Sequence, residues 1–136
     1  MKKRLLALFS LAIAATFSIA AEGHSAQENK EDAARHRAMA TAHSAAAQCL
    51  GSKSSPEACL VTLKASCSGL AVGKFCGLKQ EAWGNAAKSL TQTAQAHQAA
   101  AACVEAGKSE DVCMADLQSA CKGLAIGKFC GMVHAH

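Results

Sequence analysis

The end of the chain, "CGMVHAH", places four potential metal ligands at alternate positions: Cys130, Met132, His134 and His136. In an extended segment alternate side chains point the same way, so a thiolate, a thioether and two imidazoles would converge. Such donors favour Cu(I), with zinc or another thiophilic ion as an alternative. The competing interpretation is a solvated tail in which Cys130 already belongs to a disulfide. An earlier copy of this segment, "CGLKQ", carries neither Met nor His.

A second candidate metal site lies on the alanine-rich stretch 30–50. His36, Met39 and His43 are three and four residues apart there, so they share one face of a helix. Only His43 has a counterpart in the second half of the chain, at His97. The alternative is that His43 and His97 lie at the edge of an apolar stripe and bind no metal.

The eight cysteines all lie beyond residues 1–21, which have three basic residues followed by an uncharged apolar run that closes on small residues. This arrangement is typical of a Sec-type signal peptide and predicts a periplasmic or secreted protein. In an oxidising compartment four disulfides are the expected state. Reduced cysteines would instead offer two four-thiolate clusters for Cu(I) or zinc, but their spacing lacks the short C-x2-4-C steps of structural zinc sites.

The chain contains a tandem repeat. A shift of 54 residues aligns the cysteines of one half with those of the other without a gap: Cys49 with Cys103, Cys59 with Cys113, Cys67 with Cys121, and Cys76 with Cys130. It also aligns "GLAVGKFCG" with "GLAIGKFCG". We therefore predict a signal peptide at 1–21, one repeat at 22–77, and a second at 78–136 with a short His/Met tail, the two repeats forming one compact domain.

Each repeat is predicted to be a helical hairpin. Residues 30–50 and their counterpart, from about 80 to 106, are rich in alanine, the best helix former. Residues that mark helix ends recur in both copies, with Ser55 and Ser109 as N-caps and Gly69 and Gly123 as C-caps. No strand pattern competes. The fold class is therefore all-α, two tandem disulfide-stapled hairpins forming a small antiparallel helical bundle.

Helix geometry ranks the possible disulfides. Cys59 and Cys67 are eight residues apart on one predicted helix, or about 12 Å, whereas a disulfide needs Cα atoms within roughly 7 Å. The crossed pairing leaves Cys49 and Cys67 mismatched by about 12 Å along the hairpin axis. Cys49 and Cys59 instead stand opposite each other across the turn. We predict Cys49–Cys59 and Cys103–Cys113 and, by elimination, Cys67–Cys76 and Cys121–Cys130.

Composition excludes several functions. Three of the 14 Lys and Arg residues lie in the leader but all 10 acids lie beyond it, which leaves a formal charge of +1. We therefore expect no nucleic-acid or anionic-membrane partner, and no stable membrane insertion after signal removal. The chain lacks C-x-x-C, a phosphate loop and any catalytic triad pattern, so no enzyme is expected. The leading hypothesis is a non-enzymatic exported protein that binds soft metal ions for sequestration or tolerance, with copper as the expected ion. The alternative is a disulfide-stapled structural or protein-interaction module without metal.

Overall fold

The computed structural model describes residues 25–134, so the predicted signal peptide and His136 lie outside the described residues. The described part contains helices and no strand: α1 (Ala26–Leu50), α2 (Pro56–Ser66), α3 (Gln80–Trp83), α4 (Ala86–Glu105) and α5 (Glu110–Ala120). The prediction of an all-α fold is confirmed.

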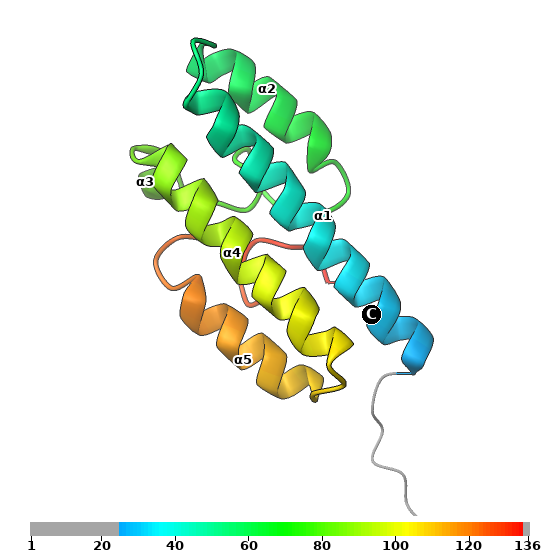
Figure 1. Ribbon diagram of the computed structural model, residues 1–136. Coiled ribbons are helices and arrows are strands. Elements are labelled where there is room, and N and C mark those ends of the chain that lie inside the picture. The colour runs from blue at the N-terminus through cyan, green and yellow to red at the C-terminus, as the bar shows by residue number, and fades with distance from the viewer. Residues whose placement is uncertain (1–24, 135–136) are drawn as a thin grey trace, which may run out of the picture.

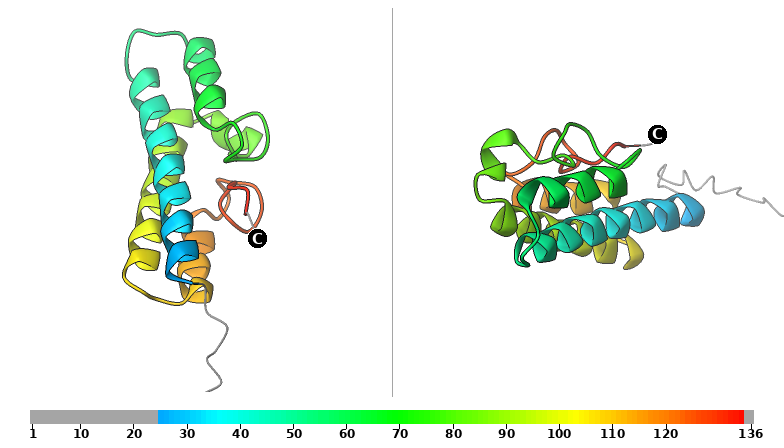
Figure 2. Two further views of the ribbon diagram at one scale, coloured as in Figure 1. Left: turned by 90° about the vertical axis from the view of Figure 1, so that its right-hand side faces the viewer. Right: turned by 90° about the horizontal axis from the view of Figure 1, so that it is seen from above.

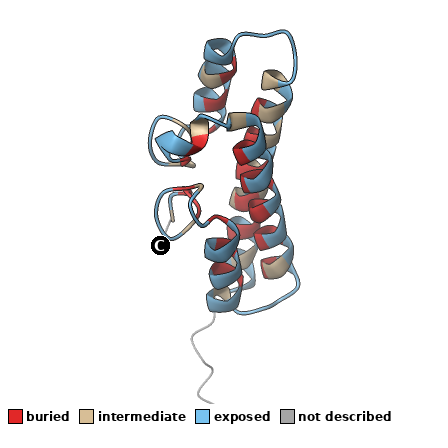
Figure 3. Cartoon of the chain, turned by 90° about the vertical axis from the view of Figure 1, so that its left-hand side faces the viewer, coloured by how far each residue is buried: buried red, intermediate tan, exposed pale blue. Residues whose placement is uncertain are grey.

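The long helices α1 and α4 run antiparallel to each other and form the centre of the molecule (Figure 1). Helix α2 packs on α1, and α5 packs on α4. Two further views show that α2, α5 and the irregular segments after them lie on one side of the α1–α4 pair (Figures 2 and 3). The predicted hairpins are thus joined side by side through their long helices.

Helices α2 and α5 begin directly after the predicted N-caps Ser55 and Ser109, whereas α1 begins at a capping residue that was not predicted, Ser25. At the start of α1 the Ser25 hydroxyl accepts from the Glu28 N–H at 3.2 Å, and the Glu28 carboxylate accepts from the Ser25 N–H at 2.6 Å. This capping box moves the helix start upstream of the predicted residue 30. Ser55 caps α2 by accepting from the Ala58 N–H. Ser109 occupies the same position in α5 without a side-chain hydrogen bond.

The prediction of one long second helix, from about 80 to 106, is wrong. The chain breaks this segment into α3 and α4, with Gly84 at the end of the first and Asn85 before the second. Glycine is a poor helix former, and the first repeat has Lys30 and Glu31 at these positions, where α1 is unbroken.

The predicted glycine C-caps are also displaced. Helix α2 ends at Ser66 with Cys67 as its C-cap, so Gly69 lies two residues further on. Gly69 still adopts a left-handed backbone with φ of 75°, which glycine tolerates without a steric penalty. The glycine therefore shapes the segment after the helix.

After α2 and α5 the chain forms two irregular segments, which we call latch 1 (67–79) and latch 2 (121–133). The latches lie against each other through two isolated antiparallel bridges, Ala71 with Met132 and Leu78 with Ala125. The two bridges join equivalent positions, because the 54-residue offset relates Ala71 to Ala125 and Leu78 to Met132. The two repeats are therefore related by an approximate two-fold axis.

Backbone hydrogen bonds at the axis obey the same symmetry. The Val72 N–H donates to the Gly131 oxygen at 2.9 Å, and the Ile126 N–H donates to the Gly77 oxygen at 2.8 Å. Gly77 and Gly131 approach so closely that a Cβ on Gly77 would lie 2.4 Å from the Gly131 Cα. The latches can therefore meet only because both crossing residues are glycines.

The apolar core is thin and divided between the two halves. One cluster surrounds Leu117 between α4, α5 and latch 2, and the other surrounds Leu63 and Leu90. Phe129 packs against both clusters, whereas Phe75 stacks on Trp83 with ring centroids 5.0 Å apart. The latch aromatics thus complete a core that alanine alone fills poorly.

Candidate functional site

All eight cysteines are joined in disulfides, and the predicted pairing is confirmed. The bonds are Cys49–Cys59, Cys67–Cys76, Cys103–Cys113 and Cys121–Cys130. Each one connects two residues of the same repeat. No free cysteine is left among the described residues, so in this oxidised state no thiolate cluster is available to a metal ion.

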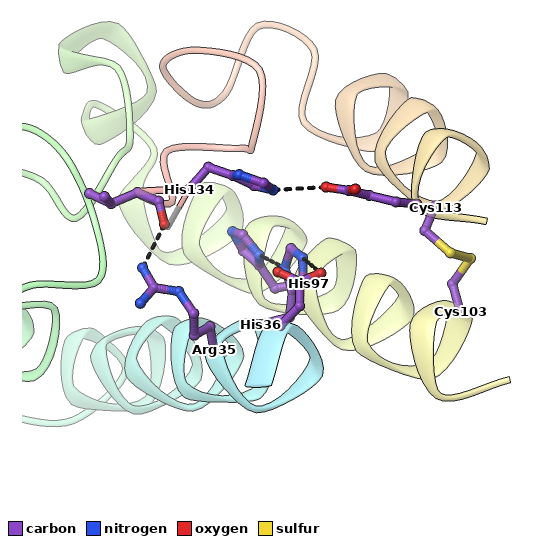
Figure 4. A network of polar contacts seen from close by, with 9 residues as sticks. Arg35, His36, His97, Cys103, Cys113 and His134 are labelled. Atoms are coloured by element: carbon purple, nitrogen blue, oxygen red, sulfur yellow. Dashed lines mark hydrogen bonds and ion pairs between the residues drawn. A yellow bond between two sulfur atoms is a disulfide. The ribbon is translucent and has the colours of Figure 1, made fainter. Parts of the chain in front are cut away.

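The three described tail residues, Cys130, Met132 and His134, do not converge on one site. Cys130 is bonded to Cys121, and Met132 is buried in the core. His134 turns toward α5 (Figure 4), where its Nε2 lies 2.8 Å from the Glu110 Oε1. Its ring stacks on Phe129 with ring centroids 4.0 Å apart. Across residues 25–134, no three His, Cys, Asp or Glu side chains are arranged to hold a metal ion. A site completed by His136 stays a prediction.

The structure does bring the other candidate histidines together. His36 and His43 of α1 and His97 of α4 are fully buried at the interface of the long helices, and Met39 is buried beside them. The Nδ1 atoms of His36 and His97 are 2.9 Å apart, and the His43 and His97 rings stack at 6.0 Å. The shared face on α1 was foreseen, but the partner of His36 comes from the other repeat (Figure 4).

His43 and His97 connect the long helices to the latches at equivalent positions. The Nε2 of His43 lies 2.9 Å from the Cys76 oxygen, and the Nε2 of His97 lies 3.0 Å from the Cys130 oxygen. Both cysteines have a positive φ, 53° and 52°, which is uncommon for residues other than glycine. Each imidazole N–H that donates to such a carbonyl stabilises the strained turn that positions the latch disulfide.

The buried histidines are surrounded by more hydrogen-bond acceptors than neutral imidazoles have N–H groups to donate. His43 has a carbonyl oxygen at each ring nitrogen, that of Met39 at Nδ1 and that of Cys76 at Nε2, but a neutral ring carries one N–H. The Nε2 of His36 has no hydrogen-bond partner and lies 3.6 Å from the Asp32 Oδ2. The buried Asp32 carboxylate therefore lies at one end of a row of three imidazoles, His36, His97 and His43.

Burial keeps these histidines neutral at pH 7. The pKa of His97 is lowered to about 3, mainly by desolvation and next by the adjacent His36. Desolvation also lowers the pKa of His36, against the opposing effect of the Asp32 carboxylate. It lowers the pKa of His43 as well, although two carbonyl oxygens favour its charged form. The cluster acts in the structure as a hydrogen-bonded part of the core.

No family model, curated protein or solved structure matches this chain. None of the helices in residues 25–134 is both long enough and apolar enough to cross a bilayer. Between α1 and α4, an open groove of about 480 Å³ is lined by uncharged side chains: Ala40, Thr41, Ser44, Ala45, Gln48, Thr91, Ala94, Gln95 and Gln98. It contains no titratable group and so no candidate for acid–base chemistry.

Sequence reasoning missed the juxtaposition of the two latches. The phrases "GLAVGKFCG" and "GLAIGKFCG" are 54 residues apart, yet their backbones exchange hydrogen bonds across the two-fold axis. The near identity of the phrases was the available signal, because segments that touch around a symmetry axis must fit copies of themselves.

Proposed function

We propose that this chain is a non-enzymatic, disulfide-stapled helical module that acts by surface recognition in an exported, oxidising compartment, the bacterial periplasm first. The observation that carries this proposal is that the reactive side chains serve the fold itself. All eight cysteines are in disulfides, and the three interior histidines bond to backbone oxygens or to each other. Four disulfides are typical of an oxidising, exported environment.

Exposed apolar side chains support recognition by the surface. Val72 and Ile126 occupy equivalent positions on the two latches and are 39% and 42% exposed. Val133, at the end of latch 2, is exposed to a similar degree. A group of exposed apolar residues bordered by polar ones is a common feature of surfaces that bind a partner.

The test is to isolate the processed protein from its native compartment, count its free thiols under denaturing conditions and measure bound copper and zinc. We expect no free thiol and no stoichiometric metal. Several free thiols accompanied by bound copper would overturn the proposal in favour of metal sequestration through the cysteines.

A second candidate function, soft-metal binding for tolerance, is favoured by one observation. His134 is held beside Glu110 at the end of the described chain, with His136 two residues beyond it. Oxidation of the cysteines does not change these histidines, and imidazole suits copper and zinc alike. We expect a His134→Ala, His136→Ala double variant to lose Cu(I) or zinc uptake, measured by competition with a chromophoric chelator. Val133→Ala is the control, and equal uptake by all three proteins would refute the tail site.

A further inference from the structure

The two latches carry unbalanced positive charge. Residues 67–79 and 121–133 contain no Asp or Glu, but they contain four exposed lysines: Lys74, Lys79, Lys122 and Lys128. None of these lysines takes part in an ion pair within residues 25–134. Their charges are therefore available to a partner.

Exposed apolar groups lie on the same two latches. The Ile126 Cδ1 lies 3.4 Å from the point where a Cβ of Gly73 would be, so this side chain of latch 2 covers the turn next to Val72 in latch 1. Both apolar residues are partly exposed. The latches occupy the side of the α1–α4 pair that also carries α2 and α5 (Figures 2 and 3). We call the exposed surface of the two latches the latch face.

We propose that the latch face docks on the anionic surface of a lipid bilayer. This inference rests on the proposed function and names its partner. The sequence-based exclusion of an anionic membrane relied on the formal charge of only +1 beyond residue 21. Folding brings latch 1 and latch 2, which carry the exposed Lys74 and Lys128, against each other across the two-fold axis.

The type of basic residue on the latch face favours a lipid surface over a protein as the binding partner. The basic residues of the latch face are all lysines, which act as flexible point charges, whereas arginine forms the directed bidentate pairs typical of specific carboxylate recognition. Protein interfaces are enriched in arginine and aromatic residues and depleted in lysine. Lysines near an anionic leaflet are attracted without any fixed geometry. If a second copy of the chain bound through the same face, the four lysines of one copy would face the four lysines of the other, which is unfavourable.

The expected binding is peripheral, reversible and weakened by salt. Each lysine close to an anionic leaflet strengthens partitioning by about fivefold. Loss of two lysine charges should therefore weaken binding by roughly 30-fold. Because salt screens exposed charges over about 10 Å, the affinity should fall steeply as ionic strength rises.

The experiment is co-sedimentation of the processed, oxidised protein with phosphatidylcholine vesicles, with or without phosphatidylglycerol, at low and high salt. We expect binding only to the vesicles that contain phosphatidylglycerol, and only at low salt. A Lys74→Gln, Lys128→Gln double variant should bind roughly 30-fold more weakly. The matched control is Lys53→Gln with Lys108→Gln, which removes the same charge from the exposed turns of the two hairpins and should change binding little.

A Val72→Ser, Ile126→Ser variant adds a second readout. It should weaken binding while leaving the salt dependence intact, because the lysines remain. Equal loss in both lysine double variants would overturn the assignment to the latch face, and binding to pure phosphatidylcholine would overturn the electrostatic argument. Binding to polyglutamate but not to vesicles would assign the face to an acidic protein. If the protein has no free thiols and no bound metal but also does not bind vesicles, the lipid proposal is refuted and the proposed function is retained.

Discussion

Acid should destabilise this protein well above the pH at which its carboxylates titrate. The folded pKa of His97 is about 3, whereas an exposed histidine in the unfolded chain titrates near 6.5. Below pH 6.5 the unfolded chain therefore binds more protons than the folded one. The stability that neutral His97 contributes is complete above pH 6.5 and is lost as the pH falls from 6.5 toward 3.

The size of the effect follows from the shift in pKa. A difference of about 3.5 pKa units at 1.36 kcal/mol each gives an upper limit of roughly 5 kcal/mol for His97 by pH 3, and about 2 kcal/mol by pH 5. The pKa values of His36 and His43 are lowered too, so they act in the same direction. Against a typical domain stability of about 5–15 kcal/mol, this loss is large.

The geometry explains why the histidine cluster resists a second proton. One proton on His36 is balanced by the Asp32 carboxylate, 3.6 Å from its Nε2. The Nδ1–Nδ1 hydrogen bond between His36 and His97 needs one of these two nitrogens to be unprotonated. A second proton breaks that bond and places two cations in the core, with Arg35 and His134 adding to the positive field around His36.

The assay is urea unfolding of the disulfide-intact protein at several pH values between 7 and 5. We expect stability to fall on acidification with a slope of at least one proton per molecule. His36→Leu, which places at position 36 the residue found at the equivalent Leu90, should lower the slope. Glu105→Gln, which removes the exposed ion pair with Arg37, should leave the slope unchanged in this range. A flat or rising stability below pH 6.5 would refute the reasoning.

Three further predictions concern the fold. Gly127→Ala should cost about 1–2 kcal/mol of stability through left-handed backbone strain alone. Gly131→Ala should cost more, because it also places a Cβ 2.3 Å from the Gly77 Cα. Equal losses of stability in urea unfolding would contradict the close latch crossing. Ser25→Ala should remove the capping box of α1 and about 1 kcal/mol of stability, while Ser109→Ala, without a capping hydrogen bond, should have a smaller effect in the same assay. Reduction of the disulfides should lower the thermal midpoint strongly, because each short loop contributes about 2–3 kcal/mol, and an unchanged midpoint would show that the apolar core suffices.

The local features of the fold were predictable from the sequence because they depend on neighbouring residues. Alanine content located the helices, and the equal distances of Cys49 and Cys59 from the turn gave the disulfide pairing. The break at Gly84 was missed because tertiary packing decides whether one glycine interrupts a helix. It was the register of α1 against α4 that brought His36 to His97, and no local pattern specifies how two helices slide past each other.

The confinement of every disulfide within one repeat has a consequence for how the molecule came to be asymmetric. A single repeat of this kind is covalently complete, and two identical copies could pair around the observed axis as a homodimer. In such a homodimer any residue at position 36 would occur twice. Fusion of the copies into one gene product removes that constraint, so one half carries His36 and the other Leu90. A single imidazole beside Asp32, with no symmetry-related copy, is compatible with a fused pair and not with a symmetric homodimer.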